Sequence, residues 1–166
     1  MKKDISQAYR ASIGAIIFNS RNEFLLVQLP SYRENEWDFV KGGMQKGEKE
    51  EETLVREIRE EIGENVDYVI LRKSIWNIIY EWPIELQVKL GFRGQARISF
   101  WVKFNSGVIT IPENEVSKYR WVSEDDITKV LIESRTQVKQ VEIFMKDWEL
   151  LKDELQVKKD IETNFC

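Results

Sequence analysis

The sequence predicts an α+β domain in which helices flank a mixed β-sheet. Short apolar runs, such as residues 11–18 (ASIGAIIF) and 98–104 (ISFWVKF), have the length and composition of buried strands. Two longer segments, residues 49–62 and 137–155, carry apolar side chains at helical spacing. The 166 residues, of which 42% are hydrophobic and 33% charged, suit one globular domain with a real core.

The elements between these segments follow from turn signals. A turn-like polar stretch at 19–22 precedes a returning strand at 23–29, and a short strand at 37–40 enters a glycine-rich turn. The glycines of this turn are Gly42, Gly43 and Gly47. Beyond the helix at 49–62 we expect a strand at 67–76, a loop at 80–83, a strand or irregular stretch to residue 90, a turn at 91–95 and a short strand at 108–111.

The last third of the chain reads as a strand followed by helix. A strand at 119–122 leads to Ser123, a predicted N-cap with Asp126 as its capping-box partner. The final helix repeats apolar residues at alternating spacings of three and four, which favours a core stripe over a coiled coil or partner-binding face. This stripe comprises Val141, Phe144, Trp148, Leu151 and Leu155. We expect a single domain over residues 1–155 and a polar, frayed tail over 156–166.

The segment at 49–62 has two distinct faces. Its apolar stripe consists of Leu54, Val55, Ile58 and Ile62, and its acidic stripe of Glu50, Glu57, Glu60, Glu61 and Glu64. Like charges three or four residues apart destabilise a helix. A hard divalent cation would remove this repulsion, since Mg²⁺ takes carboxylate oxygens and shares its shell with substrate phosphates. A plain solvated face is the ordinary alternative, because acidic helix faces are common.

Composition excludes several classes of chemistry. There is no histidine, so no histidine-based triad, general base or zinc ligand exists. The single cysteine excludes an intramolecular disulfide and fits a reducing cytoplasm. The net charge of −4 argues against broad binding to a polyanion such as duplex DNA. The apolar runs are too short for a membrane span, and no apolar signal segment follows the initial lysines; we expect a cytoplasmic protein of undetermined oligomeric state.

Residues 42–64 resemble the Nudix box, G-x5-E-x7-R-E-U-x-E-E-x-G-U with U apolar. The matching positions are Gly42, Glu48, Arg56, Glu57, Ile58, Glu60, Glu61 and Gly63. Glu64 departs from the pattern at the last position, outside the positions that bind metal in the family. The resemblance implies the α/β/α sandwich of the Nudix superfamily, with the catalytic loop and helix.

Further pieces resemble one branch of this superfamily, the bacterial RNA 5′-pyrophosphohydrolases and plant-type diadenosine tetraphosphate hydrolases. They cover residues 9–122, with valine at position 40 where proline is usual. The matching pieces are Tyr9 and Arg10 with Gly14 and Asn19; the WDFVKGG stretch at 37–43; Trp76, Tyr80 and Pro83; Gly94 and Gln95; and Glu115, six residues before Trp121.

The resemblance implies a site that holds Mg²⁺, with Mn²⁺ as an alternative. By that resemblance Glu57 and Glu61 are the principal ligands, and Glu60 is a ligand or helps to activate water. Backbone carbonyls near Lys41 and Gly42 would add oxygen ligands. Glu48 and Arg56 would form a structural ion pair. Glu115 would supply a fourth carboxylate as metal ligand or general base, with neighbouring Glu113 as the competing candidate.

Substrate contacts are predicted from charge and aromaticity. Arg10 matches an arginine that faces the 5′ phosphates in the RNA branch, and Lys41 is a second predicted phosphate partner. Tyr80 and Phe100 are expected to stack a base. Further candidates, each of which is also explained as an ordinary surface charge or core aromatic, are Arg33, Lys73, Arg97, Trp76 and Trp101.

Bound metal can neutralise phosphate charge and lower the pKa of water, which is what hydrolysis of a phosphoanhydride requires. We therefore expect a metal-dependent hydrolase that cleaves a nucleoside polyphosphate, either an RNA 5′-triphosphate end or a dinucleoside polyphosphate. A catalytically silent module that binds nucleotide or RNA is the alternative of another class. A house-cleaning nucleoside triphosphate pyrophosphatase is the other enzymatic alternative.

Overall fold

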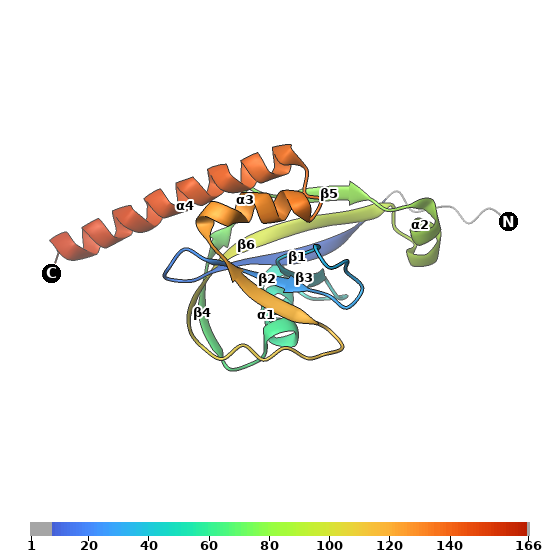
Figure 1. Cartoon of the computed structure of the whole chain (residues 1–166), viewed down its shortest axis with the longest axis horizontal. Helices are drawn as coiled ribbons and strands as arrows, with labels where there is room; N and C mark the ends of the chain where they lie inside the picture. Colours follow the sequence, from blue (N-terminus) through green and yellow to red (C-terminus); the bar gives the residue numbers. More distant parts are fainter. Residues whose placement is uncertain (1–7, 166) are drawn as a thin grey trace.

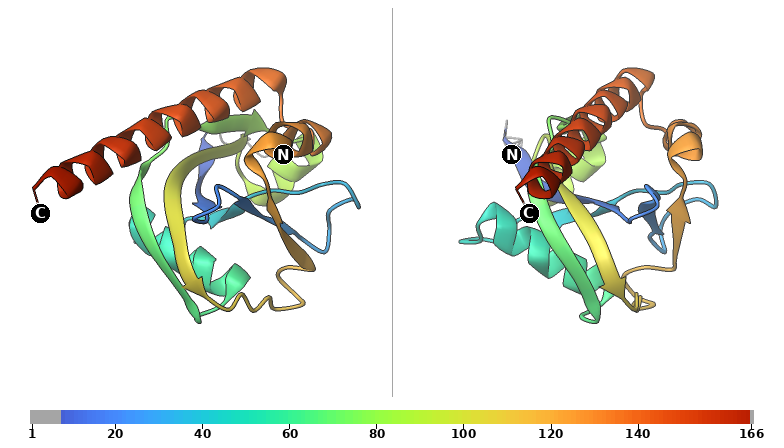
Figure 2. Two further views of the ribbon diagram at one scale, coloured as in Figure 1. Left: turned by 60° about the vertical axis from the view of Figure 1, so that its left-hand side comes forward. Right: turned by 90° about the vertical axis from the view of Figure 1, so that its left-hand side faces the viewer.

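The computed structural model describes residues 8–165 and confirms the α+β sandwich (Figure 1). Within this range, one helix covers one face of a seven-stranded mixed sheet, and two helices near the carboxyl end cover the other face (Figure 2). The elements are β1 (Tyr9–Phe18), β2 (Phe24–Gln28), β3 (Val40–Gly43), α1 (Glu50–Ile62), β4 (Val66–Lys73), β5 (Ile78–Glu81), α2 (Ile84–Leu90), β6 (Gly94–Gly107), β7 (Lys118–Val122), α3 (Glu124–Glu133) and α4 (Val138–Asn164).

Strand β1 is the centre of the sheet. It runs parallel to β6 along its whole length, from Tyr9 opposite Gly94 to Phe18 opposite Lys103. On its other edge it pairs antiparallel with β3, and at its end with β2. The order β4-β6-β1-β2-β7 completes the path, with β5 paired to β6. This pairing holds the short strand β3, which leads into α1, against a strand whose last seven residues are all buried.

Alternation along β1 separates two cores, because successive side chains of a strand point to opposite faces. Ile13 and Ile17 pack toward α1, whereas Ile16 and Phe18 pack toward α3 and α4. The α4 side is rich in aromatic rings in edge and tilted contacts, with centroids 4.9–6.5 Å apart. The predicted stripe of the last helix is confirmed, with Leu155 only partly buried.

One carboxylate lies inside the α4 core. Asp147 is 0% exposed and accepts hydrogen bonds from Trp101 Nε1 (2.7 Å), Arg72 Nη2 (3.0 Å), the Ile75 N–H (3.0 Å) and the Ser74 hydroxyl. Burial raises the pKa of Asp147, but the hydrogen bonds outweigh burial and hold the pKa below its ordinary value. This network ties α4 to β4 and β6.

Three segments differ from the predicted elements near the site. The predicted strand at 37–40 is shifted, because β3 begins at Val40 and contains Gly42 and Gly43, which were predicted to form a turn. Residues 78–81 form β5, which overlaps the loop predicted at 80–83, because β6 begins at Gly94 and pairs with them. Residues 84–90 form α2, between Pro83 and Gly91 in the left-handed conformation, where a strand or irregular stretch was expected.

Two other segments, the predicted strand at 108–111 and the tail, also differ from the prediction. Residues 108–111 form no strand, since the N–H groups of Val108 and Thr110 donate to carbonyls of Asn65 and Ile62 beside the end of α1. The tail is helical, not frayed, because α4 continues through Asn164 and projects beyond the sheet (Figure 1). The predicted N-cap is confirmed by Ser123 Oγ, which accepts from the Asp126 N–H at 3.2 Å. No helix in residues 8–165 is long and apolar enough to cross a membrane.

Candidate active site

Helix α1 begins at Glu50, after Lys49 as N-cap, and its first turn is acidic. The Lys49 N–H donates to Glu52 Oε2 at 2.9 Å, which satisfies one of the free donors of the helix end. Negative side chains here also match the positive end of the helix dipole. Leu54, Ile58 and Ile62 of the predicted apolar stripe are buried, but Val55 is 44% exposed, so the buried face is narrower than predicted.

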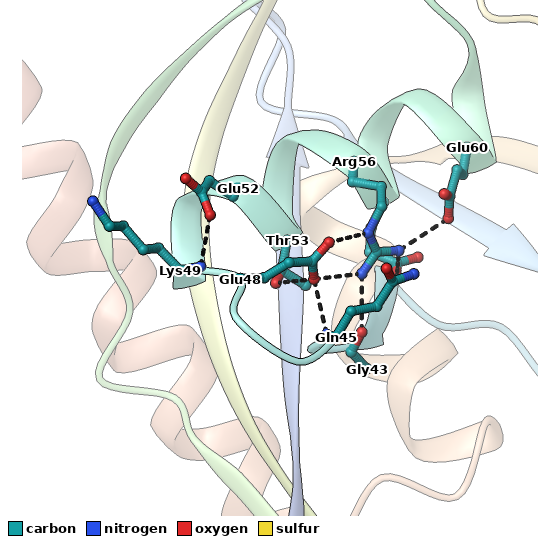
Figure 3. Close-up of polar contacts among 9 residues, drawn as sticks. Gly43, Gln45, Glu48, Lys49, Glu52, Thr53, Arg56 and Glu60 are labelled. Atoms are coloured by element: carbon teal, nitrogen blue, oxygen red, sulfur yellow. Dashed lines mark hydrogen bonds and ion pairs between the residues drawn. The ribbon is translucent and has the colours of Figure 1, made fainter.

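Arg56 joins the glycine loop to the helix (Figure 3). Its Nε donates to Glu48 Oε1 at 2.6 Å and its Nη2 to Glu48 Oε2 at 2.9 Å, so the pair is bidentate. Nη2 also donates to the Gly43 carbonyl at 3.0 Å. The hydrogen bonds from Arg56 lower the pKa of Glu48 to about 2. The predicted ion pair is therefore present, and it fixes both the loop and β3 to α1.

The same guanidinium reaches the acidic face. Arg56 Nη1 donates to Glu57 Oε1 at 2.6 Å and to Glu60 Oε2 at 3.1 Å. Glu57 is 8% exposed, and its carboxylate lies directly against Gly42 of β3. A Cβ at position 42 would lie 1.9 Å from Glu57 Cδ, so only glycine allows this approach. Burial raises the pKa of Glu57 despite the neighbouring Arg56.

Glu61 lies one turn further along the same face and is 5% exposed. Its Oε1 is 3.4 Å from the Lys41 N–H, and its Oε2 is buried without a hydrogen-bond partner among the described residues. Burial raises the pKa of Glu61 to about 8. Burial of these two carboxylates thus outweighs the neighbouring cations Arg56 and Lys41, and the pKa of each is raised.

This arrangement fits a divalent cation by its donor chemistry. Glu61 has an oxygen without a partner among the described residues, and Glu57 lies against Gly42, so two carboxylates lie beside the same strand. Carboxylate oxygens are the hard ligands that Mg²⁺ and Mn²⁺ take. Within residues 8–165, however, no three acidic, cysteine or histidine side chains gather in a metal-binding cluster. Glu60 is held by Arg56, and Glu115 lies exposed on a turn before β7, outside any such cluster.

The two predicted phosphate partners lie on the opposite face of β3 from Glu57. A Cβ on Gly43 would lie 2.3 Å from Arg10 Nη2, so the exposed Arg10 covers that glycine. Lys41 shares this face because it is two residues from Gly43. Its Nζ is 2.8 Å from Asp38 Oδ2 and also contacts the Tyr32 hydroxyl. The backbone N–H of Lys41 points toward Glu61, whereas its side chain points toward Asp38 on the other face of β3. Lys41 therefore contacts residues on both faces of the strand.

The predicted base-stacking residues separate into two groups. Tyr80 is 38% exposed and its hydroxyl donates to Gln95 Oε1 at 3.1 Å. Phe100 is 3% exposed within the core beneath α1, and its burial argues against contact with a substrate. Trp76 and Trp101 belong to the core on the other face. Tyr80 is therefore the one member of the predicted set with a ring at the surface.

Sequence reasoning missed Asp38. Its carboxylate accepts a bidentate pair from Arg97, with Nη1 at 3.0 Å from Oδ1 and Nη2 at 3.1 Å from Oδ2, in addition to the contact with Lys41. Burial raises the pKa of Asp38, but Arg97 and Lys41 outweigh it and hold this pKa well below its usual range. The available signal was an acidic residue between the aromatic residues Trp37 and Phe39, in a segment where a short strand was expected.

Curated relatives align with almost the whole chain. A protein of Rickettsia conorii named RNA pyrophosphohydrolase is 29% identical over 157 residues, which is 90% of this chain and 96% of the relative. The protein of the same name from Rickettsia prowazekii is 30% identical over 156 residues, covering 90% and 95%.

Solved structures show the same fold. A Caenorhabditis elegans Ap4A hydrolase in a binary complex matches with a TM-score of 0.61 at 20% identity, covering 82% of this chain and 96% of that one. The MutT protein from Methanosarcina mazei Go1 matches with a TM-score of 0.57 at 21% identity, covering 90% and 99%. The family model described as NUDIX domain matches residues 8–142. The chain therefore belongs to the NUDIX domain family, which confirms the resemblance found in the sequence.

Proposed function

We propose that the protein is a divalent-metal-dependent pyrophosphohydrolase that cleaves a phosphoanhydride bond at the 5′-triphosphate end of RNA. The observation that carries the proposal is the pair of buried carboxylates, Glu57 and Glu61, beside β3. The absence of a side chain at Gly42 leaves room for Glu57 there. The names of the Rickettsia relatives support RNA as the substrate. A dinucleoside polyphosphate is the alternative substrate, since it presents the same phosphates to the same edge.

Glu57 and Glu61 would hold Mg²⁺ or Mn²⁺, with Glu60 and backbone carbonyls of β3 as further oxygen donors. When bound, the cation would neutralise phosphate charge and acidify water. Water oxygen bonds to phosphorus, the anhydride P–O bond breaks, and the leaving phosphate or pyrophosphate takes the electron pair. Glu60 or Glu115 would accept the proton of the attacking water. We also propose a cytoplasmic location, because a single cysteine suits a reducing compartment.

The substrate proposal is tested by two reactions run side by side with Mg²⁺, on a short 5′-triphosphorylated RNA and on diadenosine tetraphosphate. Release of pyrophosphate or phosphate from RNA, with slow cleavage of the dinucleotide, is the expected result. Rapid formation of ATP and AMP from the dinucleotide would transfer the assignment to that substrate. Nucleotide binding without turnover of either substrate would contradict the enzyme and favour a silent binding module.

A further inference from the structure

The two buried carboxylates of α1 lie beside β3, which is a short strand. It comprises Val40–Gly43, pairs antiparallel with β1 on one side, and is preceded by a bridge between Val27 and Asp38 on the other. A slip of one residue would turn every side chain of a strand to its other face. Gly42 would then leave the Glu57 carboxylate, where a Cβ does not fit. The geometry of the proposed metal site therefore depends on the register of β3.

A buried ion pair joins the start of β3 to a strand on the far side of β1. Asp38 lies two residues before β3, and its carboxylate accepts both ends of the Arg97 guanidinium, at 3.0 and 3.1 Å. Arg97 belongs to β6, and residues 12–15 of β1 pair with both β6 and β3, so these two strands lie on opposite edges of β1. The arginine side chain passes over Gly14, where a Cβ would lie 3.0 Å from Arg97 Cδ. The pair thus braces three adjacent strands.

The same carboxylate also holds β3 through a side chain of the strand itself. Lys41 Nζ lies 2.8 Å from Asp38 Oδ2, and the Phe39 N–H donates to Asp38 Oδ1 at 2.8 Å. Lys41 is the residue of β3 whose backbone nitrogen lies 3.4 Å from Glu61 Oε1. A chain of contacts therefore runs from Arg97 through Asp38 and Lys41 to a carboxylate of the acidic helix.

Burial makes this chain of contacts stiff. The side chains of Arg97, Lys41 and Asp38 are 4%, 14% and 24% exposed. A bidentate pair between a guanidinium and a carboxylate fixes orientation as well as distance. Removing one partner leaves the other as a buried charge without compensation, so the structure around that charge has to shift. Because Lys41 contacts the same carboxylate, the shift would include β3.

Stability alone does not account for the pair of Asp38 and Arg97. A buried ion pair is often no more stabilising than apolar side chains of similar volume, because both charges lose their hydration. What such a pair can add is the choice of one arrangement. Here it acts on the strand that lies beside Glu57 and Glu61.

We propose that Asp38 and Arg97 are positioning residues of the metal site. They set the register of β3, so that Gly42 faces Glu57 and the Lys41 backbone faces Glu61. Both act through the strand, and neither is a ligand of the cation. The inference rests on the proposed function for the cation itself, and it adds two residues to those that the acidic helix supplies.

The test is Mn²⁺ binding without substrate, measured from the electron paramagnetic resonance signal of the free ion, for wild type, Asp38→Asn and Arg97→Gln. Thermal unfolding shows which variants are folded at the measuring temperature. Both variants are expected to bind Mn²⁺ about tenfold more weakly than wild type, because both release β3. A direct charge effect would have opposite signs, since loss of an anion weakens cation binding and loss of a cation strengthens it.

The two substitutions should also be coupled. In the double variant Asp38→Asn/Arg97→Gln, the two amides can form a hydrogen bond with each other. The Mn²⁺ affinity of this variant should therefore fall by less than the product of the two single losses. A loss equal to the full product would contradict a joint role of the two residues.

Asp147→Asn is the matched control for lost stability. It makes the same change at another buried carboxylate, whose hydrogen-bond partners lie on β4, on β6 and between β4 and β5. This variant should bind Mn²⁺ as tightly as wild type does. An equal loss of affinity in Asp147→Asn and Asp38→Asn would overturn the proposal, because it would show an effect of stability alone.

Wild-type affinity in folded Asp38→Asn and Arg97→Gln, or effects of opposite sign, would also overturn the proposal. If either variant does not fold, Arg97→Lys decides, since it keeps the charge but loses the bidentate contact. It should bind Mn²⁺ about threefold more weakly, and wild-type affinity in this variant would contradict the proposal. A wild type that binds no Mn²⁺ would refute the metal site of the proposed function and this inference with it. Binding of Mn²⁺ without turnover of any substrate would refute only the proposed hydrolysis.

Discussion

Replacing Glu61 by Gln should make the protein without metal more stable, although it removes a predicted metal ligand. Glu61 is 5% exposed and one of its oxygens has no partner among the described residues, so its ionised form is poorly solvated. Its pKa is about 8, against an ordinary value of 4.5. A folded-state pKa above the unfolded value costs stability as pH rises from the unfolded pKa to the folded one. The neutral amide avoids this cost.

The size of the effect follows from 1.36 kcal/mol per pKa unit, which gives ~3 kcal/mol at pH 7. The amide must itself be solvated, so we expect a net gain of about 1–3 kcal/mol, or roughly 3–10 °C in Tm for a chain of this size. The gain should vanish near pH 4.5, grow toward pH 8 and then level off. Thermal unfolding in EDTA at several pH values measures it.

Addition of Mg²⁺ should offset most or all of the difference in stability between wild type and variant. A ligand at 100 times its Kd stabilises the protein that binds it by about 2.7 kcal/mol, and this gain should appear in wild type and be lost in Glu61→Gln. Turnover should be lost in the variant as well. A variant that is less stable than wild type in EDTA, and that gains as much from Mg²⁺ as wild type, would refute the reasoning about this carboxylate.

Three further predictions concern single positions. Gly42→Ala places a Cβ against the Glu57 carboxylate and should reduce turnover about 100-fold. Gly43→Ala meets only the flexible end of the exposed Arg10 side chain and should retain most activity. Comparable rates in the two variants would contradict the importance of the contact between Gly42 and Glu57. Asp147→Asn should lower the free energy of unfolding in urea by about 2–3 kcal/mol at pH 7. The difference between variant and wild type should shrink as pH falls below about 4, because the lowered pKa of Asp147 means that only its ionised form is stabilised. A difference that stays constant with pH would contradict this role of the carboxylate. Glu115→Gln should lower kcat about 100-fold and Glu113→Gln should not. If the pH–rate profiles of the two variants show the loss of kcat in Glu113→Gln and not in Glu115→Gln, the two residues exchange roles.

The acidic helix α1 could be predicted from the sequence because its signals are local. Apolar residues at helical spacing predict α1 without knowledge of distant segments, and the resemblance to the Nudix box implied the ion pair of Glu48 and Arg56. The position of Glu61 relative to Arg56 follows from the same geometry. What could not be derived is how deeply the carboxylates are buried, since that depends on the edge of β3.

The missed features depend on contacts between distant segments. Gly42 and Gly43 resemble turn residues, yet they lie in a strand because they pair with Ile13 and Ser12 of β1. The pair of Asp38 and Arg97 joins residues 59 positions apart, and no local pattern announces it. Helix α2 buries no side chain, so it lacks the apolar stripe on which helix prediction depends. Its flanking proline and glycine were the usable signal.

The central claim is that a cation held by Glu57 and Glu61 drives phosphoanhydride cleavage. The most direct test is the initial rate on a 5′-triphosphorylated RNA as a function of Mg²⁺ concentration, for wild type and Glu57→Gln, with circular dichroism to show that both are folded. The account predicts no turnover in EDTA, saturable activation of wild type and a rate at least about 100-fold lower in the variant. Wild-type rates in a folded Glu57→Gln protein, or undiminished turnover in EDTA, would contradict it.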